Sequence, residues 1–241
     1  MICKNCGLEA GDKYCSHCGQ LTSTSRISVK EMLWNFWDIF THAEHGILKA
    51  IYELTIKPAH IAQEYIAGKR KKYFSPIKYL VVVVSLSAIL ILNYSSFGLP
   101  FEPSFPGDSN IDDIVEQDYF NHKNYKIQLF LSIPLASLIS FLVFRKSGFN
   151  FAENLVLNTY LLAHVILFHT ILITPSIILA SPSVDQWIIV FYLSISIIYA
   201  SLAYIMFFKG KKYINFLKAL ITVVLFSAAY NLISQGLRKI F

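Results

Sequence analysis

Five apolar runs occupy most of the chain after residue 76, and each is a candidate for a helix that crosses about 30 Å of hydrocarbon. They lie near residues 77–97, 127–144, 154–180, 187–208 and 216–235. The second run is short, and the third is long enough that Pro175 is expected to kink or end it. The pattern predicts an all-α integral membrane protein with about five transmembrane helices.

A different pattern precedes these runs. From Lys30 to about Ile56, apolar residues recur at helical spacing, and Ser28 is the expected N-cap of this helix. The stripe consists of Leu33, Trp37, Phe40, Ile47, Ile51 and Leu54, widened by Trp34 and Phe36. Trp34 and Trp37 suit the lipid headgroup region, but the stripe equally suits packing against the ends of the spans. Both interpretations place an amphipathic helix at the membrane surface.

Pro58 ends this helix, and a second short helix is expected from His60 to Ala67, with Gly68 as its stop signal. A basic and aromatic collar follows, made of Lys69, Arg70, Lys71, Lys72 and Tyr73. Such a collar attracts anionic lipids, and Tyr73 is expected to anchor it at the interface. The simpler interpretation is a topology signal for the first span.

Composition agrees with a membrane protein. Of the 241 residues, 55% are hydrophobic and 15% are charged, and the mean hydropathy is +0.50, which is too apolar for a soluble globular domain. The net charge of +6 does not favour nucleic acid as a partner, because the basic residues cluster beside the apolar runs, where membrane topology already accounts for them.

The distribution of charge predicts the orientation. Basic clusters lie before the first run, after the second and after the fourth, at Lys69–Lys72 with Lys78, at Arg145 and Lys146, and at Lys209, Lys211 and Lys212. The loop at 98–126 is acidic and is expected to face outward. This pattern places the N-terminus in the cytoplasm. Arg238 and Lys239 depart from it, so the last run is either a full span or a re-entrant or interfacial helix.

All four cysteines lie in the first twenty residues, with the spacing C-x2-C-x8-C-x2-C. They are Cys3, Cys6, Cys15 and Cys18. Two facing C-x2-C turns supply the four thiolates of a closed, structural zinc site, and Gly7 and Gly19 are suited to the positive φ that each turn needs. Disulfides or a thioredoxin-like pair fit this spacing and context less well. We therefore predict a zinc ribbon with one zinc ion at 1–20, a linker at 21–28, interfacial helices and collar at 29–75, and the membrane bundle at 76–241.

Three motifs occur in order along the first third of the chain: Tyr14-Cys15-x-x-Cys18-Gly19-Gln20, Lys57-Pro58, and Tyr65-Ile66-x-Gly68-Lys69-Arg70-x-x-Tyr73-x-x-Pro76. With the amphipathic helix between the first two, this order resembles that of bacterial family 3667 of unknown function. Lys57 and Ala59 stand where arginine and glycine are expected. The resemblance covers about the first third of the chain. It implies a ribbon ahead of a transmembrane bundle in the bacterial cytoplasmic (inner) membrane, and it implies no activity.

Ionisable residues inside hydrocarbon are costly, so those in the third run are candidates for function. On a helix, Asn158 and His169 fall on nearly one face, with His164 on a neighbouring line. Residues of the fourth and fifth runs can extend this polar seam, namely Tyr192, Tyr199, Tyr230, Asn231 and Gln235. Hydrogen bonding between helices is the favoured explanation, and a conduction or substrate pathway is the alternative. A second metal site at His42 and His45 lacks further ligands.

No phosphate-binding loop, HExxH, GxSxG or paired-carboxylate arrangement is visible, so we do not expect an enzyme. The first functional hypothesis is a cytoplasmic docking or regulatory module, in which the ribbon binds a protein partner while the bundle anchors it among membrane lipids. The second is a transporter or channel subunit, assembled as a homo-oligomer, with Asn158, His164 and His169 along its pathway.

Overall fold

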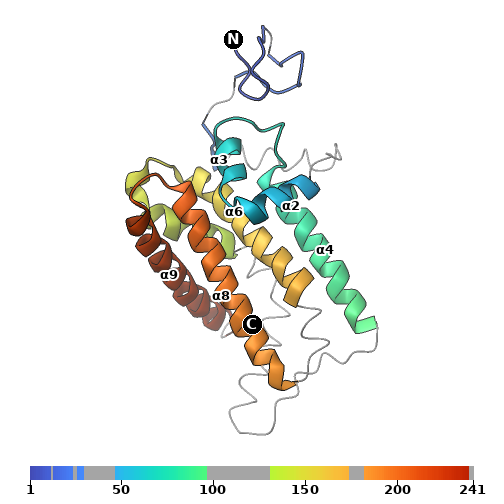
Figure 1. Ribbon diagram of the computed structural model, residues 1–241, viewed down its shortest axis with the longest axis vertical. Coiled ribbons are helices and arrows are strands. Elements are labelled where there is room, and N and C mark those ends of the chain that lie inside the picture. Colours follow the sequence, from blue (N-terminus) through green and yellow to red (C-terminus); the bar gives the residue numbers. More distant parts are fainter. Residues whose placement is uncertain (12, 24–25, 30–46, 97–130, 174–181, 239–241) are drawn as a thin grey trace.

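The computed structural model describes residues 1–11, 13–23, 26–29, 47–96, 131–173 and 182–238, and these residues are helical apart from the N-terminal module and the connections (Figure 1). The helices are α2 (Ile47–Ile56), α3 (His60–Ile66), α4 (Pro76–Ser96), an apolar helix Leu131–Val143, the 3-10 turn η2 (Arg145–Ser147), α6 (Phe151–Phe168), the π-helical turn η3 (His169–Ile173), α8 (Pro182–Phe207) and α9 (Lys212–Arg238).

Helices therefore occupy all five places where the apolar runs predicted them. Three are long and apolar enough to cross a membrane: Phe151–Leu172, Val190–Phe207 and Lys212–Gly236. The last of these is continuous, so α9 has the length of a full span. Within the described residues, Pro76–Leu90 and Leu131–Val143 are shorter apolar helices. The structure thus supports a membrane protein with three candidate spans, and the count of five stays a prediction.

Helix α6 is the centre of the bundle and contacts α2, α3, α4 and α8. It starts with a capping box: the Asn150 side chain accepts a hydrogen bond from the Glu153 amide, and the Glu153 carboxylate accepts one from the Asn150 amide. Of its apolar stretch 56% is buried, against 28% for α8 and 11% for α9. Helix α9 packs mainly on α8, so most of its apolar surface is left to face lipid.

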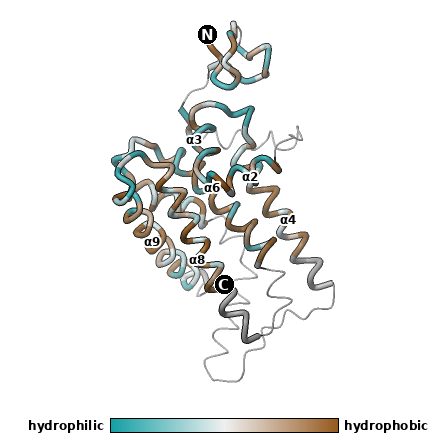
Figure 2. The backbone as a smooth tube through the Cα atoms, viewed as in Figure 1, coloured by the Kyte–Doolittle hydropathy of each residue, from teal (hydrophilic) through white to brown (hydrophobic). Residues whose placement is uncertain are grey.

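One end of the bundle gathers the N-terminal module and the basic connections. Helices α4, α6 and α9 begin at this end and α8 finishes there (Figure 1). The three basic clusters found in the sequence therefore lie at the same end, and Figure 2 shows hydrophilic residues in these connections above largely apolar helices. We call this the module end of the bundle.

Two short helices cover the module end. Helix α3 starts after Pro58, as predicted, and its Gln63 side chain donates to the carbonyls of Met206 and Phe207 at the end of α8, over 2.8 and 3.2 Å. Gly68 stops α3 with φ +108°, and the Lys69 amide bonds back to the Glu64 carbonyl. The predicted helix from Lys30 is described from Ile47 onward, and Trp34, Trp37, His42 and His45 lie outside the described residues.

The segment expected to be a linker is attached to α6. Arg26 makes a bidentate ion pair with Glu153, with Nε–Oε1 and Nη2–Oε2 distances of 2.8 Å, and Nη2 also donates to the Gly148 carbonyl. The Ile27 side chain is buried, and its carbonyl accepts from the Asn150 side chain. The chain leaving the N-terminal module is therefore fixed to the start of α6, 127 positions further along.

We expect Arg26→Ala to lower the free energy of unfolding by about 1–3 kcal/mol, because it leaves the nearly buried Glu153 carboxylate without its charged partner. Denaturation of the purified protein in detergent micelles measures this change. Arg145→Ala, an exposed arginine in η2, is the matched control and is expected to have little effect. Equal stability of the two variants would show that the ion pair contributes nothing.

Candidate metal centre

The cysteines lie in two turns that repeat each other at a spacing of twelve residues. In the first, the Gly7 amide donates to the Cys3 carbonyl and the Cys3 amide to the Leu8 carbonyl, both over 2.9 Å. In the second, the Gly19 amide donates to the Cys15 carbonyl and the Cys15 amide to the Gln20 carbonyl, both over 2.8 Å. Gly7 and Gly19 have φ of +77° and +68°, as the sequence predicted. Isolated antiparallel bridges, Ile2 with Glu9 and Tyr14 with Leu21, flank the turns. We call residues 1–11 and 13–22 the cysteine module.

The four sulfurs converge on one point. All Sγ atoms lie within 4.8 Å of one another, with Cys3–Cys18 at 3.6 Å and Cys6–Cys15 at 3.7 Å. A tetrahedron with metal–sulfur bonds of about 2.3 Å has edges of about 3.8 Å, so these separations fit a metal ion. All four cysteines are free thiols, and the Cys3–Cys18 and Cys6–Cys15 separations are far above the about 2.05 Å of a disulfide. The arrangement can hold a metal ion.

The electrostatics of the cluster also suit a cation. Hydrogen bonds from the amides of Cys6 and Asn5 lower the pKa of Cys3 to about 6, and those from Cys18 and His17 lower the pKa of Cys15. The Leu8 amide acts in the same direction on Cys6, but partial burial and the neighbouring thiols raise the pKa of Cys6 to about 11. Crowded thiols resist losing every proton without a positive ion to neutralise them.

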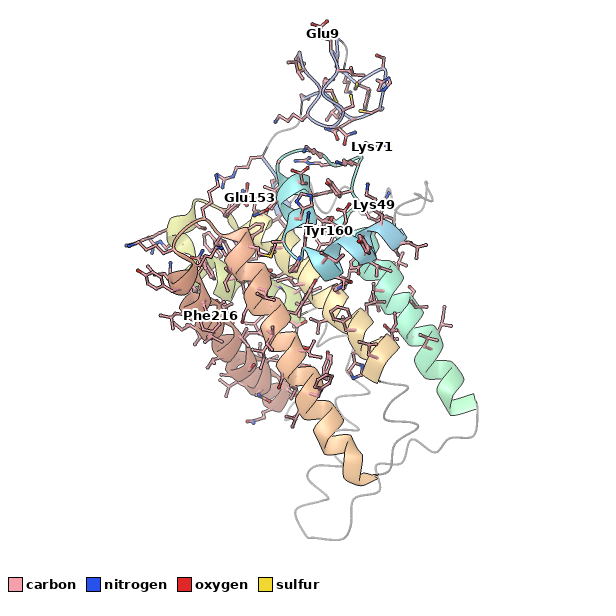
Figure 3. All side chains as sticks on the ribbon, in the orientation of Figure 1. Glu9, Lys49, Lys71, Glu153, Tyr160 and Phe216 are labelled. Carbon is pink, nitrogen blue, oxygen red and sulfur yellow. The ribbon has the colours of Figure 1, made fainter. Side chains whose placement is uncertain are left out.

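The module is joined to the basic segment Lys69–Lys72 by two amide side chains. Gln20, 4% exposed, donates from Nε2 to the Gly68 carbonyl over 2.7 Å. Its Oε1 accepts from the amides of Arg70 and Lys71 over 3.1 and 3.2 Å, and Asn5 Oδ1 accepts from the Lys72 amide over 3.0 Å. Figure 3 shows Lys71 between the module, where Glu9 is labelled, and the bundle below. The basic segment is therefore the surface on which the module sits.

The side chains of the basic segment differ in their surroundings. Lys69 is paired with Glu64, and this hydrogen bond lowers the pKa of the Glu64 carboxyl. Lys71 and Lys72 are exposed, and the Lys72 ammonium lies 5.2 Å from the centre of the Tyr73 ring. Tyr73 was expected at the lipid interface, but its ring is buried against His60 in the protein core. The turn after Gly68 directs this ring inward.

Helix α2 packs on the bundle through Ala50 and Leu54, and the Leu54 carbonyl accepts from the Tyr199 hydroxyl of α8 over 3.1 Å. Its exposed residues Leu48, Tyr52 and Ile56 lie at intervals of four on another face. For the described part of the amphipathic segment, the packing interpretation therefore holds, and an apolar face is still left over.

His164 is fully buried and joins α2, α4 and α6. Its Nδ1 lies 2.7 Å from the Tyr79 hydroxyl and its Nε2 lies 3.1 Å from the Thr55 hydroxyl. Thr55 Oγ1 also lies 2.8 Å from the Ile51 carbonyl, so the His164 ring shares this hydroxyl with the backbone of α2. Both ring nitrogens are used within the protein.

Asn158 belongs to a separate polar cluster. Its amide donates to Ser140 over 2.9 Å and its carbonyl oxygen accepts from Tyr204 over 2.6 Å. His169, in contrast, is exposed beside the edge of the Tyr192 ring. Helical spacing puts Asn158 and His169 on nearly one face, but Asn158 is buried among hydrogen-bond partners and His169 is exposed. The three predicted pathway residues therefore do not form one line. Asn231 of α9 is exposed and bonds within its own helix to Ser227.

Comparison with known proteins is informative for the segment that contains α2, α3 and the basic segment. Residues 44–88 match the family described as Protein of unknown function (DUF3667). The match confirms the resemblance over this segment, which includes Lys57-Pro58 and the stretch from Tyr65 to Pro76. The cysteine module and most of the bundle lie outside it. Searches of the curated proteins and of the solved structures gave no match.

The matched segment, residues 44–88, supplies the surface that the cysteine module binds. Gly68 and the amides of Arg70, Lys71 and Lys72 all lie within it, as do Thr55 and Tyr79, which hold His164. Sequence reasoning identified the cysteines and the collar but missed Gln20 as their connection. The only signal was its place directly after Cys18-Gly19 in the motif that carried the resemblance.

Proposed function

We propose that this protein is a multi-pass protein of the bacterial cytoplasmic membrane whose cytoplasmic cysteine module binds one structural zinc ion and acts as a docking or regulatory module. Four converging thiols are a donor set that zinc favours, and a closed set of four thiolates stabilises a fold without performing catalysis. The position of the basic clusters at the module end supports the cytoplasmic orientation, in which thiols also stay reduced.

The observation that carries the proposal is the attachment of the module by Gln20 and Asn5. Four hydrogen bonds to backbone groups set the position of the module on the basic segment, so its remaining surface is held in a defined orientation. That surface exposes several apolar side chains, including Ile2 at 71% and Tyr14 at 56%. Exposed apolar groups on a small rigid module favour contact with another protein. We therefore assign the docking role to the exposed surface of the module.

Photo-crosslinking in the native membrane tests the docking role. A photoreactive phenylalanine analogue at position 14 is expected to give a discrete protein adduct, and Ile2→Asp or Cys15→Ser is expected to lower its yield by about tenfold or more. The same analogue at position 213, an exposed tyrosine at the start of α9, is the matched control, and its adducts should not change with these substitutions.

The outcomes separate the possible partners. An adduct with twice the mass of the chain would identify a second copy as the partner and a homo-oligomer as the assembly. Absence of an adduct from position 14, or equal yield from the Cys15→Ser variant, would contradict the docking role. Metal analysis of the same purified protein should find one zinc per chain.

A further inference from the structure

Three successive backbone amides of the basic segment point at the cysteine module. Those of Arg70 and Lys71 converge on a single oxygen, Gln20 Oε1, and that of Lys72 donates to Asn5 Oδ1. Consecutive amides that converge on one atom form a nest, a backbone arrangement that binds anionic oxygens. Here the oxygen in the nest belongs to a neutral amide.

The charge around this nest suits an anion better than an amide. The nest lies in a run of four consecutive cationic residues, Lys69 to Lys72, of which Lys71 and Lys72 are exposed. Hydrogen bonds to an ionised acceptor are roughly twice as strong as bonds to a neutral one. Gln20 therefore accepts the hydrogen bonds of the nest, but as a neutral amide it does not balance the positive charge of the basic segment.

The position of the nest indicates where such an anion comes from. The basic segment ends four residues before Pro76, where the apolar helix α4 begins. The residues just ahead of a membrane-entering helix lie at the level of the lipid headgroups. The accessible anion of highest local concentration there is the phosphate of an acidic phospholipid.

We propose that residues 68–72 form a binding site for the phosphate group of an anionic phospholipid, and that Gln20 occupies this site as a removable plug. The proposal rests on the docking or regulatory role of the cysteine module. When the module leaves the basic segment, a phosphate oxygen replaces Gln20 Oε1 at the amides of Arg70 and Lys71. Lys71 and Lys72 then balance its charge.

The metal centre sets the position of the plug. The Gln20 carbonyl accepts from the amide of the metal-ligand candidate Cys15 over 2.8 Å, so the second cysteine turn holds the base of the Gln20 side chain. Loss of the metal, or a partner that draws the module away, withdraws Gln20. Because coupling between two sites is reciprocal, a bound lipid in turn weakens docking of the module on the basic segment.

The test uses full-length protein in nanodiscs of phosphatidylcholine, with or without phosphatidylglycerol. Gln20→Ala removes the plug but no cysteine. In neutral nanodiscs, hydrogen exchange at the amides of Arg70 and Lys71 should be faster than in the wild type. Adding phosphatidylglycerol should restore protection, and native mass spectrometry should show about fivefold tighter binding of this lipid than to the wild type. Gln63→Ala, which removes a comparable amide tie between α3 and α8, is the control and should change neither result.

Two outcomes would overturn the proposal. The first is Gln20→Ala protein that retains zinc but binds no more phosphatidylglycerol than the wild type. The second is protection restored equally by inorganic phosphate in neutral nanodiscs, which would make the site one for free phosphate. Metal analysis of the nanodisc samples and position-14 crosslinking in the native membrane keep the two proposals apart. A wild type without zinc, or without an adduct in the native membrane, contradicts the proposed function, whereas the comparison of Gln20→Ala with the wild type still decides the lipid site.

Discussion

The Cys15→Ser variant is expected to lose its bound metal and to release the basic segment from the cysteine module. The buried apolar residues of the module are Cys3, Ala10 and Cys15, packed with the partly buried Cys6 and Cys18, so the thiols themselves make up most of its apolar core. Metal binding in small four-ligand modules contributes about 10–16 kcal/mol of folding free energy, far more than such a core can supply. Without the metal, the module has no other source of comparable stability.

Release has a measurable consequence at the basic segment. The amides of Arg70, Lys71 and Lys72 lose their partners on the module, and trypsin should cut after Lys71 and Lys72 about tenfold faster or more. Limited proteolysis together with metal analysis checks both parts. Ser16→Ala, an exposed neighbour in the same turn, is the control and should behave as the wild type. A serine variant with a full equivalent of zinc and unchanged cleavage would contradict the assignment of Cys15 as a ligand.

The second large effect is expected at His164. Replacement by alanine opens a cavity where the ring packs against Phe168 and Tyr199, with centroid distances of 4.4 and 5.3 Å, and removes the hydrogen-bond partner of the Tyr79 hydroxyl. Hydrogen bonds between membrane helices are individually modest, so most of the cost is lost packing. We expect His164→Ala to lower the free energy of unfolding by about 2–4 kcal/mol and to detach α2 from the bundle.

His169→Ala is the matched control for this variant, since it removes the same side chain five positions later on the continuing helix, at an exposed site. Unfolding in detergent micelles and hydrogen exchange of α2 measure both variants. The packing role predicts a loss for His164→Ala alone. A pathway that uses both histidines predicts that each variant lowers flux into proteoliposomes. If both variants lose flux and are equally stable, the pathway is favoured over the packing role.

Local sequence signals were reliable where neighbouring residues decide the structure. The short helix α3 and its stop at Gly68 followed from Pro58 and from the need for positive φ, because both act within one turn of the chain. The cysteine cluster followed from spacing, since two C-x2-C turns leave few ways to place four sulfurs. Helices at the five apolar runs followed from hydropathy.

The polar contacts between elements could not be obtained in this way. Helical spacing put His169 near Asn158 on one face of the helix. It could not show which residues of other helices pack against that face at each of the two positions. Tyr79 was one of several polar residues in an apolar run, and only the packing of α4 on α6 brings it to His164. The same holds for Tyr73, whose direction depends on the turn that precedes it.

By itself, the sequence determined a helical membrane protein with a compact cysteine cluster, because hydropathy, turn chemistry and ligand spacing act over short distances along the chain. Only the tertiary structure decided that Gln20 binds the loop 48 positions away and that Arg26 binds Glu153 at 127 positions. A single buried amide or charge leaves no periodic mark in a sequence, and its partner depends on which faces meet when the helices pack. In this protein those isolated contacts join the cysteine module to the helix bundle.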